Sequence, residues 1–303
     1  MANTSSNILI AMKNYADVNA FFAPVFNTSA YPNGLGLWSA DTPLTNLQNR
    51  FLSIKSRTLD CVPDSTQFVI DLGTTRDIEV VVIPTHNLLT ATSPTATVTL
   101  YADAALTQMV ASKSISVYPS VYSWGSLAWG SSSWWAGTVS PEDASAYPQP
   151  ILFIWPTPQL ARYVKVQIND PANAVGYIEL SRLFVCPGYQ PSVNIKYGAQ
   201  LAVADDTIVT RSMGGADYYD QRPHRRTMVM SIDYLPQNEA FSQIFDAEIR
   251  MGTSGQGFVA MFPADGTNLA RTSFLFTFAK LDPLTAAAYG VSGVSLALQE
   301  VVA

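Results

Sequence analysis

The chain is poor in charged residues, cysteine and histidine. Of its 303 residues 13% are charged, where an ordinary soluble domain has about 25%. Its 2 cysteines are too few for a disulfide-stabilised scaffold, and its 2 histidines provide few ligands for a metal centre. The 17 basic residues are scattered and the net charge is −6, so the sequence offers no footprint for nucleic acid.

The sequence also lacks a long hydrophobic run. No apolar stretch approaches the ~18 residues of a membrane span, and Asn7 to Met12 lack the basic flank and the length of a signal peptide. We therefore expect a soluble chain without a membrane span that is not secreted in the usual way. A weakly charged surface rich in Ser, Thr, Ala and Tyr is poorly suited to keeping copies apart, so we expect other subunits to cover much of it.

No catalytic signature is present. His86 and His224 have no Cys, Asp or second His at a metal-ligand spacing, and no nucleophile elbow, P-loop, zinc-protease or dinucleotide motif occurs. The carboxylate pairs Asp205-Asp206 and Glu142-Asp143 lie in polar turn regions typical of solvated loops. The sequence predicts a protein that is not an enzyme, with no catalytic residue, no cofactor and no metal ion.

One local basic cluster exists, formed by Arg222, Arg225 and Arg226. It is interpreted first as a solvated or salt-bridged loop, and phosphate binding is the alternative.

Two β-branched runs flank a polar turn between Gln67 and Pro84, QFVIDLGTTRDIEVVVIP, and predict two buried strands of a β-sandwich. Thr95 to Tyr101 alternates like a half-buried strand, Ile151 to Trp155 resumes one, and Arg162 to Ile168 with Tyr177 to Val185 completes the pattern. The apolar-Asp-Leu-Gly turn, followed by "RYVKVQI" and "GYIELSRLFV", resembles the discoidin family of galactose-binding-like jelly rolls. The resemblance covers roughly residues 44–185, and it implies that Cys61 and Cys186 are neighbours, left as thiols in a reducing cytoplasm.

The segment from Tyr118 to Pro150 has no core periodicity and is rich in Trp, Tyr, Ser and Gly. Such a composition is typical of a recognition surface, because aromatic rings give large contact area at low entropy cost. The alternative is that its tryptophans cap one end of the sandwich or pack on the neighbouring domain. The candidate interaction residues are Tyr122, Trp124, Trp129, Trp134 and Trp135.

Breakers at Pro187 to Pro191 predict a boundary between a first domain, residues 1–190, and a second domain, residues 191–303. The second domain is again mostly β, with strands predicted at 193–197, 207–211, 227–234, 257–262, 273–281 and 294–301. Its exception is Pro236 to Gly252, where Phe241, Ile244, Phe245 and Ile249 share one face of a predicted helix that packs on the sheet. The expected fold class is therefore mainly β: a jelly-roll sandwich with an N-terminal extension, then a smaller β-sandwich crossed by one amphipathic helix.

The layout of residues 193–303 resembles the tail-tube-like domain of long-tailed bacteriophages. That resemblance implies a structural protein of the virion, at the distal tail or baseplate, assembled in the host cytoplasm. Its C-terminal domain is expected to form a homo-oligomeric ring, a trimer or hexamer, that contacts other tail proteins while the jelly roll binds a partner or decorates the ring. The alternative is a carbohydrate-binding module that holds a cell-surface glycan on its tryptophan loop.

Overall fold

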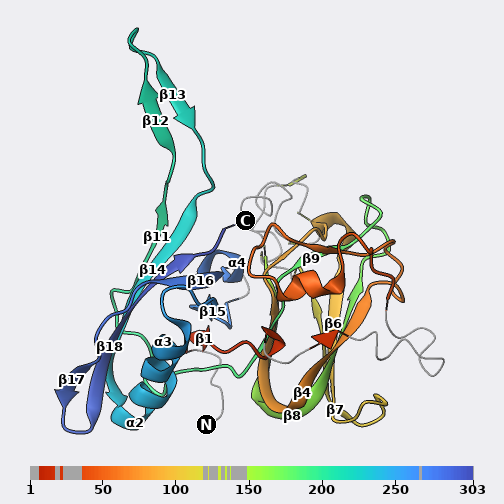
Figure 1. Ribbon diagram of the computed structural model, residues 1–303, viewed down its shortest axis with the longest axis horizontal. Helices are drawn as coiled ribbons and strands as arrows, with labels where there is room; N and C mark the ends of the chain where they lie inside the picture. Colours follow the sequence, from red (N-terminus) through yellow and green to blue (C-terminus); the bar gives the residue numbers. More distant parts are fainter. Residues whose placement is uncertain are drawn as a thin grey trace.

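The computed structural model of the chain is mainly β, as the sequence predicts, and places two β units side by side (Figure 1). It describes residues 7–17, 21–22, 36–118, 122, 129–130, 134, 137, 149–265 and 268–302. The strands are β1 (Leu9–Ala11), β2 (Phe21–Phe22), β3 (Ser56–Arg57), β4 (Gln67–Ile83), β5 (Thr85–His86), β6 (Thr95–Tyr101), β7 (Met109–Ser116), β8 (Ile151–Asn169), β9 (Glu179–Ser181), β10 (Phe184–Cys186), β11 (Gln200–Ala204), β12 (Ile208–Arg211), β13 (Asp217–Asp220), β14 (Arg225–Pro236), β15 (Gly257–Ala260), β16 (Ser273–Lys280), β17 (Thr285–Ala288) and β18 (Val291–Glu300). The helical elements are η1 (Tyr15–Asp17), η3 (Leu44–Gln48), η4 (Thr90–Thr92), α2 (Gln237–Glu239), η5 (Ala240–Phe245), α3 (Asp246–Met251) and α4 (Leu269–Thr272).

The long strands β4 and β8 form the spine of the first unit. They pair antiparallel along their lengths, within a six-stranded sheet in which β10, β4, β8, β6 and β7 lie side by side in that order and β2 also pairs with β4. Where the sequence predicted two strands and a tight turn, β4 runs on through residues 73–76, helped by the positive φ of 76° at Gly73 and a shift of register. A three-stranded sheet, β3-β9-β5, adds a second layer, and the buried side chains between the layers form one large apolar core that includes Phe68, Ile70 and Phe153.

The second unit is built on a seven-stranded sheet in which β1, β15, β16, β18, β14 and β11 lie side by side in that order and β17 also pairs with β18. Strands predicted near 207–211, 227–234, 257–262, 273–281 and 294–301 are present as β12, β14, β15, β16 and β18. The strand predicted at 193–197 is wrong, since that segment is a loop, and β17 occupies the segment around 285–288 that the sequence left unassigned. The buried face of the sheet packs on the helix through side chains such as Met230, Phe276 and Leu296.

The predicted helix is present as α2, η5 and α3, but it packs through a different face from the one expected. Ile244 is buried, whereas Phe241, Phe245 and Ile249 are 44%, 41% and 68% exposed. The physical reason is the π-helical segment η5: its wider turn breaks the 3.6-residue period on which the expectation rested. Ala240 packs with Ile244 in the core against the sheet, and Ala247 is buried beside the first unit.

Apart from β1, the strands up to β10 lie in the sheets of the first unit, and the strands from β11 onward lie in the sheets of the second unit or in its arm. Strand β1 pairs with β15 of the second unit, with Leu9 opposite Ala260. The two units also share an apolar cluster in which Val80, Val82 and Phe184 of the first unit meet Phe258 and Leu275 of the second. Because β1 belongs to the sheet of the second unit, residues 1–190 do not form a self-contained piece.

Both cysteines are buried free thiols. Cys61 lies in the core of the first unit, whereas Cys186 lies in the cluster between the units and its Sγ is 3.7 Å from the carbonyl oxygen of Val80. Side chains alternate along β10, so Val185 points into the sandwich and Cys186 points out of it. The expectation that the two cysteines are neighbours is therefore wrong.

Candidate functional site

The hairpin formed by β12 and β13, residues 208–220, is an arm that projects from the second unit beyond the ends of β11 and β14 (Figure 1). All residues of its two strands are exposed. Among the strands that the structure describes, these two pair only with each other, from Ile208 opposite Asp220 to Arg211 opposite Asp217. The arm therefore rests on no apolar layer formed by the described residues.

The arm carries paired charges and unpaired apolar surface. Arg211 lies 3.3 Å from Asp217, and Arg222 lies 3.4 Å from Asp220 just beyond the arm. The large apolar side chains are exposed: Ile208 by 44%, Val209 by 54%, Tyr218 and Tyr219 by 63% each, and Met213 at the tip completely. A surface of this kind can pair or pack with another polypeptide, but it presents no chemistry for catalysis.

The sequence predicted β12 but missed β13 and the arm that the two strands form. The available signal was Gly214-Gly215 between two short β-rich runs, which is typical of a hairpin turn. In the structure Gly215 has a φ of 84°, and its N–H donates to the Ser212 carbonyl at 3.0 Å.

The arginine cluster is salt-bridged, as its first interpretation expected. The Nε of Arg225 donates to Asp206 at 2.5 Å, and Arg226 forms an ion pair with Glu300 in which both side chains are largely buried. His224 lies 3.4 Å from Asp205 and is exposed. Carboxylates thus already occupy the guanidinium groups that a phosphate would need.

Of the predicted aromatic surface, Trp129, Trp134 and Tyr122 belong to the described residues, while Trp124 and Trp135 lie outside them, as does the pair Glu142-Asp143. Trp129 is 82% exposed, and its ring meets that of Trp134 edge to face with centroids 4.5 Å apart. The two rings contact each other, and the Trp129 ring faces solvent.

His86 has a structural role. Its Nε2 lies 2.8 Å from the carbonyl oxygen of Gln149, and the N–H of Leu88 donates to its Nδ1 at 3.2 Å. Loss of hydration lowers the pKa of His86 to about 4, so the ring is neutral near pH 7. With both nitrogens engaged, the imidazole is not placed to act as a base.

Within the described ranges, no group of three or more His, Cys, Asp or Glu side chains could hold a metal ion. No helix in the described part of the chain is long and apolar enough to cross a membrane.

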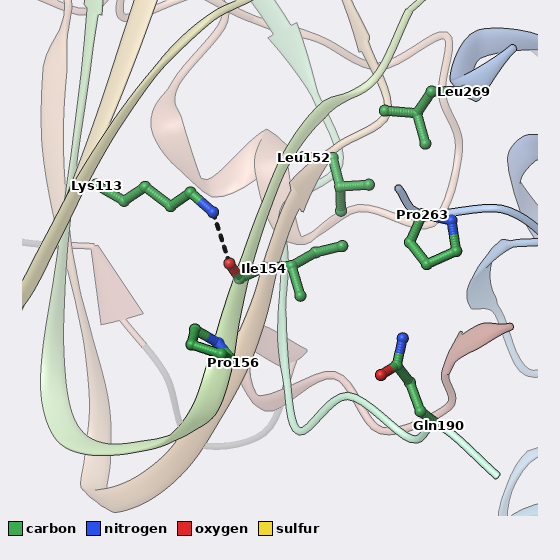
Figure 2. A pocket seen from close by; sticks show the side chains of 7 residues that line it. All are labelled: Lys113, Leu152, Ile154, Pro156, Gln190, Pro263 and Leu269. Atoms are coloured by element: carbon green, nitrogen blue, oxygen red, sulfur yellow. Dashed lines mark hydrogen bonds between the residues drawn. The ribbon is translucent and has the colours of Figure 1, made fainter. Parts of the chain in front are cut away.

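A mostly apolar cavity of about 340 Å³ lies between β8 and the second unit (Figure 2). Leu152 and Ile154 face Pro263 and Leu269 across it, and Gln190 lies at one end. At the other end the Lys113 amine donates to the Ile154 carbonyl at 2.7 Å. The cavity continues the apolar contact between the units and offers few groups that could select a ligand.

No protein-family model matches the sequence, and no curated protein matches it. Among solved structures, the chain is similar to a family 32 carbohydrate-binding module, CBM32-1, from a family 31 glycoside hydrolase of Clostridium perfringens. The identity is 12% over 56% of this chain and 96% of that one, with a TM-score of 0.35. A fucose-binding module from Streptococcus pneumoniae gives 14% identity over 57% and 94%, with a TM-score of 0.34. The family 32 module of C. perfringens NanJ, solved with galactose, gives 11% over 58% and 98%, also with a TM-score of 0.34. All three TM-scores lie below 0.5.

Proposed function

We propose that this protein is a structural subunit of a bacteriophage tail, which assembles with copies of itself through its second unit. The observation that carries the assembly is the arm: two strands with every residue exposed and with large apolar side chains on them. An isolated two-stranded hairpin is marginally stable in water, so an arm of this kind needs a surface to pack on.

A second copy of the chain fits that need better than an unrelated partner. The charges near the arm pair with each other, so they select neither a strongly acidic nor a strongly basic partner. The chain itself offers two open surfaces: the outer edge of β11, which ends the sheet, and the exposed Phe241, Phe245 and Ile249 of the helix. Contacts between unlike surfaces of identical copies generate rings when the rotation closes.

The setting within a virion rests on the likeness in layout between residues 193–303 and tail-tube-like domains. In that setting the ring is a trimer or hexamer that contacts other tail proteins, and the first unit decorates it. The first unit is the part of each subunit available to bind a further partner.

The test is removal of the arm. Residues 208–220 are replaced by an Asn-Gly turn, which can close a hairpin between the flanking chains. The trimmed chain is expected to be a folded monomer by light scattering and circular dichroism, while the full chain forms the larger species. As a control, Met213→Ser alters only the exposed tip and leaves both strands of the arm in place. A trimmed chain that keeps the oligomer of the full chain contradicts the proposal.

Glycan binding is the second candidate function, favoured by the exposed ring of Trp129 on Trp134. Aromatic faces stack on the apolar faces of sugars. Trp129→Ala should abolish binding to a glycan array without altering the fold, whereas Tyr197→Ala, an exposed aromatic residue of the second unit, should have no effect. An array on which the unaltered chain binds no glycan contradicts this candidate.

A further inference from the structure

A polar cleft of about 330 Å³ lies between β4 of the first unit and the helical segment η5–α3 of the second. One wall carries the carboxylates of Asp77 and Glu79, and the opposite wall carries Gln243 and Arg250. Lys13, just after β1, also lines it. The cleft therefore exists only because the two units are packed together.

The charges of the cleft are mixed and nearly balanced. Asp77 and Glu79 face a guanidinium and an ammonium group, so a ligand of either net charge meets repulsion as well as attraction. Glu79 is 7% exposed, which restricts the directions from which its oxygens can accept a hydrogen bond. A ligand without net charge avoids these penalties.

The Tyr15 side chain fixes part of the cleft. Its hydroxyl donates to Asp77 at 2.5 Å, and this contact orients the carboxylate. The Lys13 Nζ and the Arg76 Cζ lie 5.2 Å and 5.1 Å from the centre of its ring. Cationic groups therefore already contact the ring, and recognition in the cleft has to come from hydrogen bonds.

We propose that this cleft binds a neutral, hydroxyl-rich molecule of about the size of a monosaccharide. Each carboxylate accepts hydrogen bonds from hydroxyl groups, Arg250 donates to hydroxyl and ring oxygens, and Gln243 and Ser242 can do both. A hexose has a hydroxyl group on most of its carbons and can engage the charged groups and these two neutral side chains at once, whereas the single ammonium and single carboxylate of an amino acid can engage fewer of them. The volume lies at the lower end of the range of small-molecule pockets.

This site is separate from the Trp129–Trp134 pair, and it rests neither on the assembly nor on glycan binding by that pair. The probes are D-glucose, D-galactose and D-mannose at concentrations up to about 20 mM, with binding measured by saturation-transfer NMR and calorimetry on the full chain. The double variant Gln243→Ala/Arg250→Met changes exposed side chains of the helix and is expected to weaken binding at least about tenfold. Asp77→Asn, on the opposite wall, should also weaken it. Asp246→Ala, an exposed residue of the same helix that does not line the cleft, is the matched control and should bind as the unaltered chain does.

Three results overturn the proposal. The first is the absence of saturable binding by any of the three hexoses. The second is binding that survives both cleft variants but is lost in Trp129→Ala, which places the sugar on the aromatic pair. The third is binding of glycine betaine that depends on the cleft residues, without binding of any hexose, because it would show that the site prefers a zwitterion to a sugar. The oligomeric state of the arm-trimmed chain has no bearing on these outcomes.

Discussion

Removal of the Asp17 carboxylate tests how the N-terminal segment is held on the first unit. Arg182 follows β9, is 2% exposed, and donates from Nη1 and Nη2 to the two oxygens of Asp17 at 2.8 and 2.5 Å. The same Nη1 donates to the Gln48 carbonyl at 2.6 Å, while the Nε is buried without a hydrogen-bond partner. Within the described part of the chain, Asp17 is the carboxylate that pairs with this almost completely buried guanidinium.

The expected cost of Asp17→Ala is about 3 kcal/mol in the free energy of unfolding. Breaking a buried ion pair by removing one partner costs roughly 3–5 kcal/mol, because the remaining charge stays buried without compensation. We expect the lower end of that range because the Asp17 side chain is 33% exposed, so water can reach the guanidinium once the carboxylate is gone. Asp17→Asn should cost less, since the amide oxygen can still accept one of the two hydrogen bonds.

Urea unfolding followed by tryptophan fluorescence is the assay. All 6 tryptophans precede residue 156, so their emission reports on the first unit. Asp41→Ala, an exposed carboxylate of the same unit, is the control and should change stability by less than about 0.5 kcal/mol. A loss below about 1 kcal/mol for Asp17→Ala would refute the reasoning, because it would mean that the Arg182 charge is solvated or paired in another way.

Three further predictions concern the core, the pH and the C-terminal strand. Phe276→Ala, in the core of the second unit, should cost roughly 3–5 kcal/mol by calorimetry, while Phe245→Ala, 41% exposed, should cost about 1 kcal/mol. Equal losses would contradict the packing of the helix described above. The folded-state pKa of His86 is about 4 and lies below its unfolded value near 6.5. The stability that the neutral ring contributes is therefore fully present above pH 6.5. It falls by at most about 3 kcal/mol as the pH drops to 4. The urea midpoint of the unaltered chain should fall as the pH drops from 7 to 4, and the midpoint of His86→Gln should fall less. Equal dependence on pH in the two proteins would contradict this role of His86. Glu300→Gln should destabilise the second unit by about 2 kcal/mol, measured by calorimetry, because it weakens the ion pair between β18 and Arg226; a variant as stable as the unaltered chain would contradict this prediction.

The strands that the sequence predicted correctly are those with a clear local pattern. Thr95 to Tyr101 alternates buried and half-buried side chains over its whole length, and β6 has the same limits. The position of the helix was also predictable, because Pro236 and Gly252 bound it and its apolar residues are spaced for helical turns. Its buried face was not, since the π-helical turn of η5 shifts the side chains that meet the sheet.

The remaining features depend on contacts between segments far apart in the sequence. Nothing in Leu9 to Ala11 indicates that these residues pair with β15 in the second unit. The polar cleft has the same origin, because Glu79 and Arg250 come together only when the two units pack. The arm was not predicted because every residue of its two strands is exposed, so their sequence carries no core periodicity.

The mass of the unaltered chain in solution tests the central claim most directly. A single copy weighs 32.9 kDa, and light scattering or mass photometry resolves multiples of that value. If copies assemble through the arm, the mass corresponds to a trimer, a hexamer or a larger closed species. A chain that stays at 32.9 kDa at every concentration up to about 100 µM, well above the micromolar range of weak specific interfaces, contradicts self-assembly and leaves glycan binding as the remaining candidate function.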